Sequence, residues 1–299
     1  MITVLGSINM DLIANVSRLP TPGETVTGNH FVTAPGGKGA NQALAARRAG
    51  ATVAMAGACG EDEFAVPALT YLRFDGVNLD RVKSASTATG VALIFVGGDG
   101  ENVIAIVAGA NATVTAEDAR HAVAAMNRGD ILMQQMEIPP EAIEAGLKAA
   151  KEKGVLTIVN IAPLTADAPR LAKLADIVIA NETEFELFAG TNGLSDQARE
   201  AEMLKINRDS RQTIIVTLGA DGVVAARDGK IVRAKSLEID PVDTVGAGDT
   251  FCGYLAAGLD RKLAFDVALQ RAAVAGSLAC MKAGAQPSIP LAADVDAHM

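Results

Sequence analysis

The sequence predicts an α/β protein built on a mainly parallel sheet with helices on both faces. Short apolar runs alternate with helical stretches along most of the chain, the pattern of strands joined by crossover helices. No internal repeat, low-complexity tract or linker divides the 299 residues. The same alternation in both halves of the chain indicates a single domain.

The apolar runs that predict strands are Ile2–Leu5, Thr52–Ala58, Ile131–Gln135, Thr157–Asn160, Ile177–Ala180 and Thr213–Leu218. The helical stretches between them are Ala40–Ala49, Glu63–Phe74, Ala116–Met126, Glu141–Glu152, Glu182–Ala189 and Asp196–Asn207. Two longer helical segments follow, at about Asp249–Leu259 and Ala264–Lys282.

Two regions interrupt this alternation. Leu12–Thr33 is extended, and Thr89–Ala108 predicts two strands, Gly90–Val96 and Asn102–Val107, joined by a Gly- and Asp-rich turn. We interpret both regions as one small accessory sheet, whose strands lack helices of their own. It could serve as a substrate lid, as a dimer contact, or as a surface hairpin without a role. The prediction is one domain over residues 1–299 with lid segments at about 12–33 and 89–108.

Composition excludes several classes of protein. A net charge of −9 argues against a nucleic-acid-binding surface, and no apolar run is long enough for a membrane span. The first residues show no basic segment typical of a secretory signal. The three cysteines lie far apart, which fits a reducing compartment. We therefore expect a cytoplasmic protein without nucleic-acid or membrane partners.

The most informative segment runs from Asp243 to Phe251. Gly246-Ala247-Gly248 lies between two carboxylates and opens onto an apolar helical run. Backbone N–H groups at such a helix start can converge on an anion, and Asp249 is placed to act as a base beside it. The segment therefore predicts phosphoryl transfer onto a hydroxyl. The alternative is a Gly-rich loop in which Asp249 only starts a helix.

A second glycine-rich segment, Pro35–Gln42, also leads into a helix. Its glycines permit close approach of the backbone to a ligand, and Lys38 and Asn41 supply polar groups. Neither a Walker A loop nor a G-x-G-x-x-G fingerprint is present. Any nucleotide phosphates must therefore be held by another type of loop.

Three further polar clusters follow predicted strands. In Gly6–Asp11, Asn9 and Asp11 alternate on one side of an extended chain and suit sugar hydroxyls. Asn181–Glu184 carries acidic side chains that suit Mg²⁺, and Thr217–Gly222 is rich in small residues. Each cluster alone is compatible with an ordinary helix cap or turn, which the second and third taken separately favour. Because all five segments lie at the same end of predicted strands, together they predict a site for a phosphorylated ligand.

These segments resemble those of the ribokinase-like family of carbohydrate kinases. Gly37–Asn41 is similar to the family's N-terminal signature, and Asp243–Asp249 to its C-terminal D-T-x-G-A-G-D signature. The resemblance extends from Gly6 to about Pro290. It implies a three-layer α/β/α sandwich with a mainly parallel central sheet and a small β-sheet lid.

The resemblance also implies transfer of the ATP γ-phosphate to the 5-hydroxyl of D-ribose, giving D-ribose 5-phosphate and ADP. Asp249 would be the general base, and the N–H groups of Gly246, Ala247 and Gly248 would stabilise the transferring group. The sugar-binding residues implied are Asn9, Asp11, Gly37, Lys38, Asn41, Glu137 and Asp249. The nucleotide-site residues implied are Asn181, Thr217, Gly219, Gly222 and Gly248, with Glu184 near Mg²⁺.

A potassium ion beside the anion-binding loop is a further implication of the resemblance. Its oxygen ligands would come from Asp243, Val245, Ala279, Lys282, Gly284 and Ser288. The accessory sheet would be the lid and would also form a homodimer contact. Where related proteins often place a polar residue near adenine, this chain has the apolar run Ala272–Ala275, which leaves adenine recognition to backbone groups and packing.

Two alternatives to a ribose kinase stay open at this point. One is a kinase of the same family that acts on deoxyribose, another sugar or a nucleoside. The other is a sugar-binding sensor that has lost catalysis. Absence of the base would mark such a sensor, whereas Asp249 is present.

Overall fold

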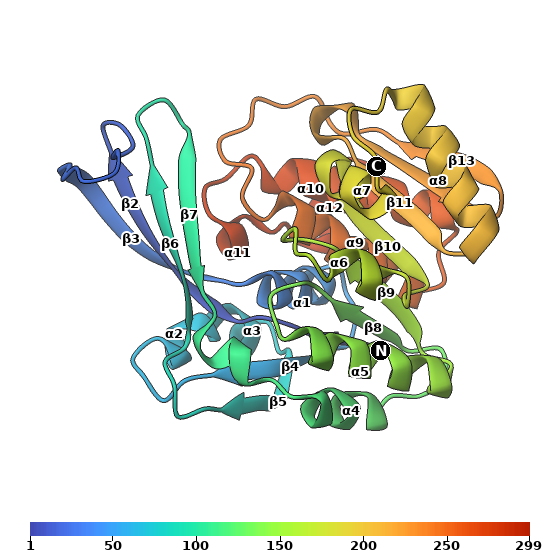
Figure 1. Cartoon of the computed structure of the whole chain (residues 1–299), viewed down its shortest axis with the longest axis horizontal. Helices are drawn as coiled ribbons and strands as arrows, with labels where there is room; N and C mark the ends of the chain where they lie inside the picture. The colour runs from blue at the N-terminus through green and yellow to red at the C-terminus, as the bar shows by residue number, and fades with distance from the viewer.

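The computed structural model describes all 299 residues, which form two sheets and their covering helices (Figure 1). The larger sheet has nine strands in the order β13-β12-β11-β10-β9-β8-β1-β4-β5. The strands from β11 to β5 in this order are parallel to one another, and β12 and β13 add to the β11 edge in antiparallel fashion. The strand bounds are β1 Ile2–Leu5, β4 Val53–Cys59, β5 Asn78–Ser84, β8 Ile131–Gln134, β9 Leu156–Asn160, β10 Ile177–Asn181, β11 Thr213–Thr217, β12 Val223–Arg227 and β13 Lys230–Ala234.

Helices cover both faces of this sheet. One face packs against α1 (Lys38–Arg48), α9 (Ala247–Asp260) and α10 (Phe265–Ala279), whose apolar side chains share one buried cluster. The opposite face packs against helices of a second cluster: α4 Ala116–Ala124, α5 Pro140–Lys153, α6 Ala168–Ala172, α7 Glu182–Ala189 and α8 Asp196–Ser210. The expected three-layer α/β/α sandwich is therefore confirmed.

Strand β10 shows why both faces are buried. Ile177 and Ile179 belong to the first apolar cluster, whereas Val178 and Ala180 belong to the second. Successive side chains of a strand point to opposite faces. A continuous apolar run therefore fits a strand with helices on each side.

The smaller sheet has the strand order β3-β2-β6-β7 and projects beside the main body (Figure 1, left). Its strands are β2 Asn9–Val16, β3 Gly28–Gly36, β6 Gly90–Val96 and β7 Asn102–Val107. β2 and β6 are parallel, and the other two pairs are antiparallel. Because β2 begins at Asn9, three residues before the predicted extended region, Asn9 and Asp11 lie at the base of this sheet.

One predicted helix is divided in two, and the ends of the others lie within three residues of their predicted positions. The stretch Glu63–Phe74 is divided into α2 (Ala65–Ala68) and α3 (Thr70–Phe74) around Leu69, whose N–H bonds the Val66 carbonyl three residues earlier. α10 ends at Ala279 instead of Lys282. The Cys280 carbonyl instead accepts hydrogen bonds from the N–H groups of Val242 and Asp243.

Three strands at the two ends of the large sheet and several short helices have no counterpart among the predicted elements. They comprise β5, β12, β13, α6, and the C-terminal α11 (Ala285–Ser288) and α12 (Ala292–Asp296). β5 alternates polar and apolar residues and is partly exposed. An edge strand needs no continuous apolar run, so it escapes detection by that criterion.

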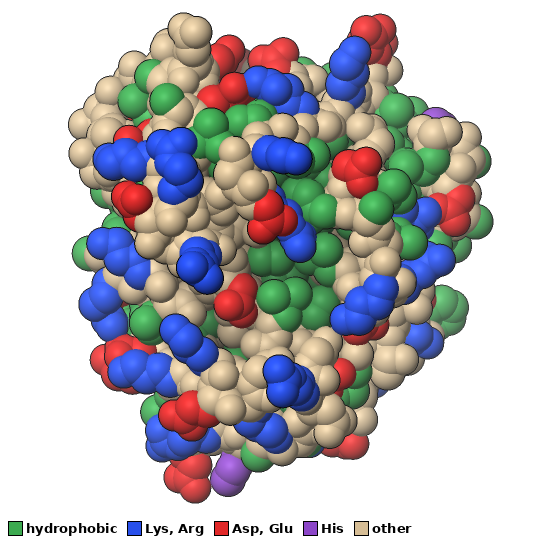
Figure 2. Space-filling model, turned by 90° about the vertical axis from the view of Figure 1, so that its right-hand side faces the viewer, with side chains coloured by type: hydrophobic (Ala, Val, Ile, Leu, Met, Phe, Trp, Pro, Cys, Tyr) green, Lys and Arg blue, Asp and Glu red, His purple; other side chains and the backbone are tan.

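The face of the molecule opposite the small sheet carries Lys and Arg side chains mixed with Asp and Glu (Figure 2). Neither sign of charge forms a continuous region there. None of the helices in the structure combines the length and the apolar character needed to span a bilayer.

Candidate active site

Two adjoining cavities lie where the parallel strands end and α9 begins. Their volumes are about 520 Å³ and about 220 Å³. Thr217, Thr244 and Gly248 line both cavities, so the two spaces meet at the N-terminus of α9. Site residues expected from the sequence that line the smaller cavity are Lys38, Asn181, Glu184, Thr217, Gly246, Gly248 and Asp249.

The start of α9 forms the wall shared by the two cavities. Gly246 is the N-cap residue with φ 78°, a conformation that favours glycine. A Cβ at this position would lie 3.0 Å from the backbone of Ala285. The first-turn N–H groups of a helix lack intrahelical acceptors, so this wall offers donors and the positive end of a helix dipole to an anion.

Asp249 is buried in the first turn of α9 and is held by two side-chain amides. Its Oδ2 accepts a hydrogen bond from Asn41 Nδ2 at 2.9 Å, and its Oδ1 accepts one from Gln42 Nε2 at 2.9 Å. The side-chain oxygen of Asn41, Oδ1, is buried and has no hydrogen-bond partner within the protein, an uncommon state for a buried polar atom.

Glu137, which follows β8, reaches the start of α1. Its carboxylate accepts hydrogen bonds from the Ser7 hydroxyl and from the backbone N–H of Lys38, the latter at 3.1 Å. Gly37 has φ 88°, and a Cβ there would lie 2.7 Å from the backbone nitrogen of Asn9. The second glycine-rich segment thus approaches the base of β2 closely, which brings these expected sugar-binding residues together.

Burial and neighbouring charges shift the ionisation of this cluster. Burial and the negative charges of Glu137 and Asp249 raise the pKa of Asp11 to about 7, against the opposing effect of Lys38. Burial lowers the pKa of Lys38, but Asp249, Glu137 and Glu184 outweigh burial, so the net shift of that pKa is upward. Lys38 therefore keeps its positive charge at neutral pH and can attract a phosphate.

At the start of α7, Asn181 and Glu184 form a capping box. Asn181 Oδ1 accepts from the N–H of Glu184 at 2.8 Å, and Glu184 Oε2 accepts from the N–H of Asn181 at 2.9 Å. The helix-cap role considered for this segment is thus present, and both residues still line the smaller cavity. Burial raises the pKa of Glu184, although the hydrogen bond from Asn181 opposes the shift.

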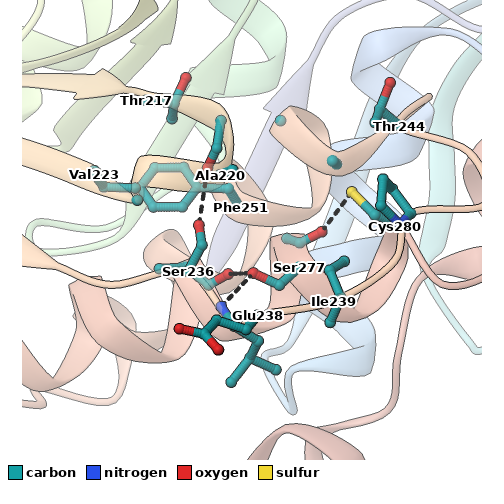
Figure 3. A pocket seen from close by; sticks show the side chains of 18 residues that line it. Thr217, Ala220, Val223, Ser236, Glu238, Ile239, Thr244, Phe251, Ser277 and Cys280 are labelled. Carbon is teal, nitrogen blue, oxygen red and sulfur yellow. Dashed lines mark hydrogen bonds between the residues drawn. The ribbon is translucent and has the colours of Figure 1, made fainter.

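The larger cavity is a mostly apolar slot between the β11–β12 turn and α10 (Figure 3). Two of its polar side chains are bonded within the protein. The Ser236 hydroxyl donates to the Gly219 carbonyl at 2.9 Å, and the Ser277 hydroxyl donates to the Ala273 carbonyl at 3.0 Å. Phe251 contributes an aromatic wall. Such a slot suits a flat, weakly polar group that is recognised through packing and backbone contacts.

The residues expected at the potassium site lie on two segments, Asp243–Val245 and Ala279–Ser288, which are joined by a hydrogen bond. Asp243 Oδ1 accepts from the N–H of Val245 at 3.0 Å, and its Oδ2 accepts from the N–H of Gly284 at 2.8 Å. Ser288 is buried and donates to the Ala285 carbonyl. The donor set is one carboxylate, one hydroxyl and backbone carbonyls, the oxygen ligands that suit a potassium ion.

The expected site residues thus fall into three groups. The first lines the two cavities. The second group lines neither cavity but contacts the first group or lies beside it; its members are Asn9, Asp11, Gly37, Asn41 and Glu137. The third, around Asp243, lies behind the α9 loop and lines neither cavity.

Several cavity or contact residues were not assigned a role from the sequence. Gln42 lies within the recognised Pro35–Gln42 segment, where an amide beside Asn41 in an Ala-rich helix was an available signal. Gln42 touches Asp249 without lining a cavity, whereas Asn160, Thr244 and the segment Ser236–Ile239 each line one. No sequence pattern marks Ser236–Ile239, because its role arises only from its place beside α10.

Comparison with known proteins agrees with this geometry. The model of the pfkB family of carbohydrate kinases matches residues 1–292. The chain is 36% identical over 290 residues to a ribokinase of Haemophilus influenzae, covering 97% of this chain and 95% of that protein. It is 35% identical over 302 residues to a ribokinase of Mus musculus, covering 98% and 93% respectively.

A solved structure is similar over nearly the whole chain. The ribokinase of Arabidopsis thaliana, complexed with ribose and ATP, superimposes with a TM-score of 0.88 at 31% sequence identity. The match covers 99% of this chain and 97% of that one. The likeness therefore includes both the main body and the small sheet.

Proposed function

The chain belongs to the pfkB family of carbohydrate kinases, and we propose that it phosphorylates D-ribose at the 5-hydroxyl with ATP as donor. The observation that carries this proposal is the meeting of two cavities at Gly248 of the α9 loop, next to Asp249 in the smaller cavity. One cavity is an apolar slot, and the other is polar and contains Lys38. A nucleotide in the first would point its phosphates at a sugar hydroxyl beside Asp249.

In the proposed reaction, Asp249 accepts the proton of the 5-hydroxyl. The 5-oxygen forms a bond to the γ-phosphorus, the bond from that phosphorus to the bridging oxygen of ADP breaks, and ribose 5-phosphate and ADP result. The N–H groups of Gly246, Ala247 and Gly248 and the ammonium of Lys38 stabilise the charge on the transferring group.

The sugar is proposed to lie at the base of the small sheet. Asn9 and Asp11 would bind its hydroxyls, with Gly37, Lys38, Asn41 and Glu137 around it. The hydrogen bonds from Lys38 to Glu137 and from Asn41 to Asp249 support this placement, because they hold these polar groups together. Donor and acceptor groups side by side are what a polyhydroxylated ligand requires.

ATP is proposed to occupy the larger cavity, with Thr217, Gly219 and Gly222 along the nucleotide. Mg²⁺ would be held chiefly by the phosphates, with the carboxylate of Glu184 nearby. This fits the donor chemistry, because Mg²⁺ prefers few protein ligands and several phosphate or water oxygens. The ion would neutralise charge on the phosphates.

A potassium ion is proposed behind the α9 loop, held by Asp243, Ser288 and the carbonyl groups named for it above. Bound there, it would stabilise the conformation of the loop by electrostatic attraction to these oxygens. It would not contact the sugar.

The small sheet is proposed as a lid and as a homodimer contact of a cytoplasmic single-domain enzyme. Cross-strand register places Phe31, Leu93, Phe95, Val103 and Val107 on the face opposite that of Asp11. All five side chains are at least 39% exposed. A monomer seldom exposes a contiguous apolar face of this kind, so a second copy of the same sheet is its proposed partner.

An ATP-consumption assay with purified protein tests the function. We expect ribose to be phosphorylated more efficiently than deoxyribose, fructose or adenosine, and potassium to increase the rate. Preference for another acceptor would move the assignment to that substrate within the family. No acceptor-dependent ADP formation, together with measurable ribose binding, would support the sensor alternative instead.

A further inference from the structure

Gln42 lies directly behind Asp249 and is separated from both cavities. Its side chain is fully buried on α1 and does not line either cavity. Its Nε2 donates to Asp249 Oδ1 at 2.9 Å and is 3.3 Å from Asn160 Oδ1. It can therefore act on a bound substrate only through the residues that it touches, Asp249 at 2.9 Å and Asn160 at 3.3 Å.

A second glutamine holds Gln42 in this orientation. Gln135, which directly follows β8, donates from its Nε2 to Gln42 Oε1 at 2.7 Å, and it is also fully buried. Because the Gln42 carbonyl accepts this bond, its amide group must face Asp249. A chain of side-chain hydrogen bonds thus runs from Gln135 through Gln42 to the carboxylate.

We propose that Gln42 is a positioning residue that fixes the orientation of Asp249 for proton acceptance, an inference that rests on the function proposed above. With Asn41 on Oδ2 and Gln42 on Oδ1, each carboxylate oxygen has one amide donor. These bonds define the plane of the carboxylate while leaving each oxygen a further lone pair. Removing one donor frees the carboxylate to rotate away from the sugar hydroxyl.

The expected consequence is a loss of turnover without a loss of binding. Gln42→Met retains the length of the side chain but has no amide. We expect kcat to fall by about 10- to 100-fold, since small misplacements of a reacting group have effects of this size. The KM values for ribose and ATP should stay close to those of the parent protein, because the Gln42 side chain lines neither cavity and bonds no proposed sugar-binding residue other than Asp249.

The pH dependence provides a readout that lost packing alone would not change. A hydrogen-bond donor stabilises the ionised form of a carboxylate, so its removal should move the acidic limb of the kcat–pH profile to higher pH. Lys38, Asp11, Glu184 and Cys252 are coupled electrostatically to Asp249. All four are the same in parent and variant, so their contributions are common to both profiles.

Gln134 provides a matched control. It is a fully buried glutamine at the end of β8, neither polar atom of its amide has a hydrogen-bond partner, and its amide lies close to Gly146 of α5. Gln134→Met therefore removes the same chemical group from the core without touching Asp249. We expect this variant to retain the parent kcat and the parent pH profile.

The experiment compares steady-state kinetics of the parent, Gln42→Met and Gln134→Met between acidic and neutral pH, with thermal unfolding as a check of folding. A lower kcat and a displaced acidic limb in Gln42→Met alone would support the inference. Parent-like kinetics in Gln42→Met, or equal losses in both variants with an unmoved limb, would overturn it. Absence of ribose phosphorylation by the parent protein would instead count against the proposed function.

Discussion

The side-chain oxygen of Asn9 accepts a hydrogen bond of 2.7 Å from the side-chain amide of Asn111. Asn111 is buried at the return from the small sheet and also bonds both backbone groups of Ile8. Because the side-chain carbonyl of Asn9 is occupied, only its amide N–H groups are left to bind a ligand. In the sugar site proposed above, Asn9 would therefore offer donors and the nearby Asp11 an acceptor.

Replacing Asn111 should weaken sugar binding specifically. Asn111→Leu removes the donor to Asn9 and leaves both backbone groups of Ile8 without their partner. We expect the KM for ribose to rise about tenfold, the range expected when one such hydrogen bond is lost, with the KM for ATP unchanged. Steady-state kinetics with each substrate varied in turn measure this, and an unchanged ribose KM would contradict it.

The raised pKa of Asp11 predicts a pH-dependent stability in the absence of sugar. The folded state holds this proton up to about pH 7, whereas an unfolded aspartate loses it near pH 3.9. Stability from protonated Asp11 is therefore fully present below about pH 4 and is lost as pH rises through about 7. Asp11→Asn imitates the neutral form and should remove this loss.

Urea unfolding between about pH 5 and about pH 8 measures this effect. The free energy of unfolding of the parent should fall relative to Asp11→Asn across this interval, by on the order of a few kcal/mol. Parallel curves for the two proteins would show that Asp11 does not hold its proton in the folded state.

Asp243 provides a test of the potassium site. Asp243→Ala removes the carboxylate that joins the N–H groups of Val245 and Gly284. We expect the variant to lose potassium activation and any rise in melting temperature that potassium gives the parent over choline at equal ionic strength. The exposed neighbour Asp240 serves as control through Asp240→Ala. If Asp243→Ala still responded fully to potassium, the proposed potassium site would be ruled out.

The apolar face of the small sheet can be tested by its effect on assembly. Phe95→Asp places a charge in the middle of that face and should convert a dimer to a monomer, because burying an unpaired charge is unfavourable. Light scattering over a range of concentrations gives the mass. Phe74, which is 85% exposed outside this sheet, provides the control variant Phe74→Asp. A dimer that persists in Phe95→Asp would exclude this face.

The sequence predicts the parts of the fold that depend on continuous burial. Runs such as Ile177–Ala180 are apolar because both faces of the strand are covered, so they stand out in the sequence. The edge strand β5, with Asn78, Asp80 and Arg81 in it, does not. Helix ends are predicted less well where tertiary contacts determine them. At the end of α10, the Cys280 carbonyl accepts hydrogen bonds from Val242 and Asp243, which belong to another segment.

The candidate site likewise contains residues that the sequence identifies and residues that only the folded structure identifies. Asp249 and the glycines of its loop are recognisable because an anion site requires small residues at a helix start. Gln42, Gln135 and Asn111 act through contacts with residues more than ninety positions away in the chain. No local pattern encodes such pairs, so only the folded structure identifies them.

The role of Asp249 as the base is tested most directly by the turnover of Asp249→Asn with ribose and ATP. The carboxamide can keep a similar shape but cannot accept the hydroxyl proton. The expected result is a fall in kcat of about 10²- to 10⁴-fold, with ribose binding still measurable by calorimetry. Turnover close to that of the parent protein would contradict the assignment of Asp249 as the base.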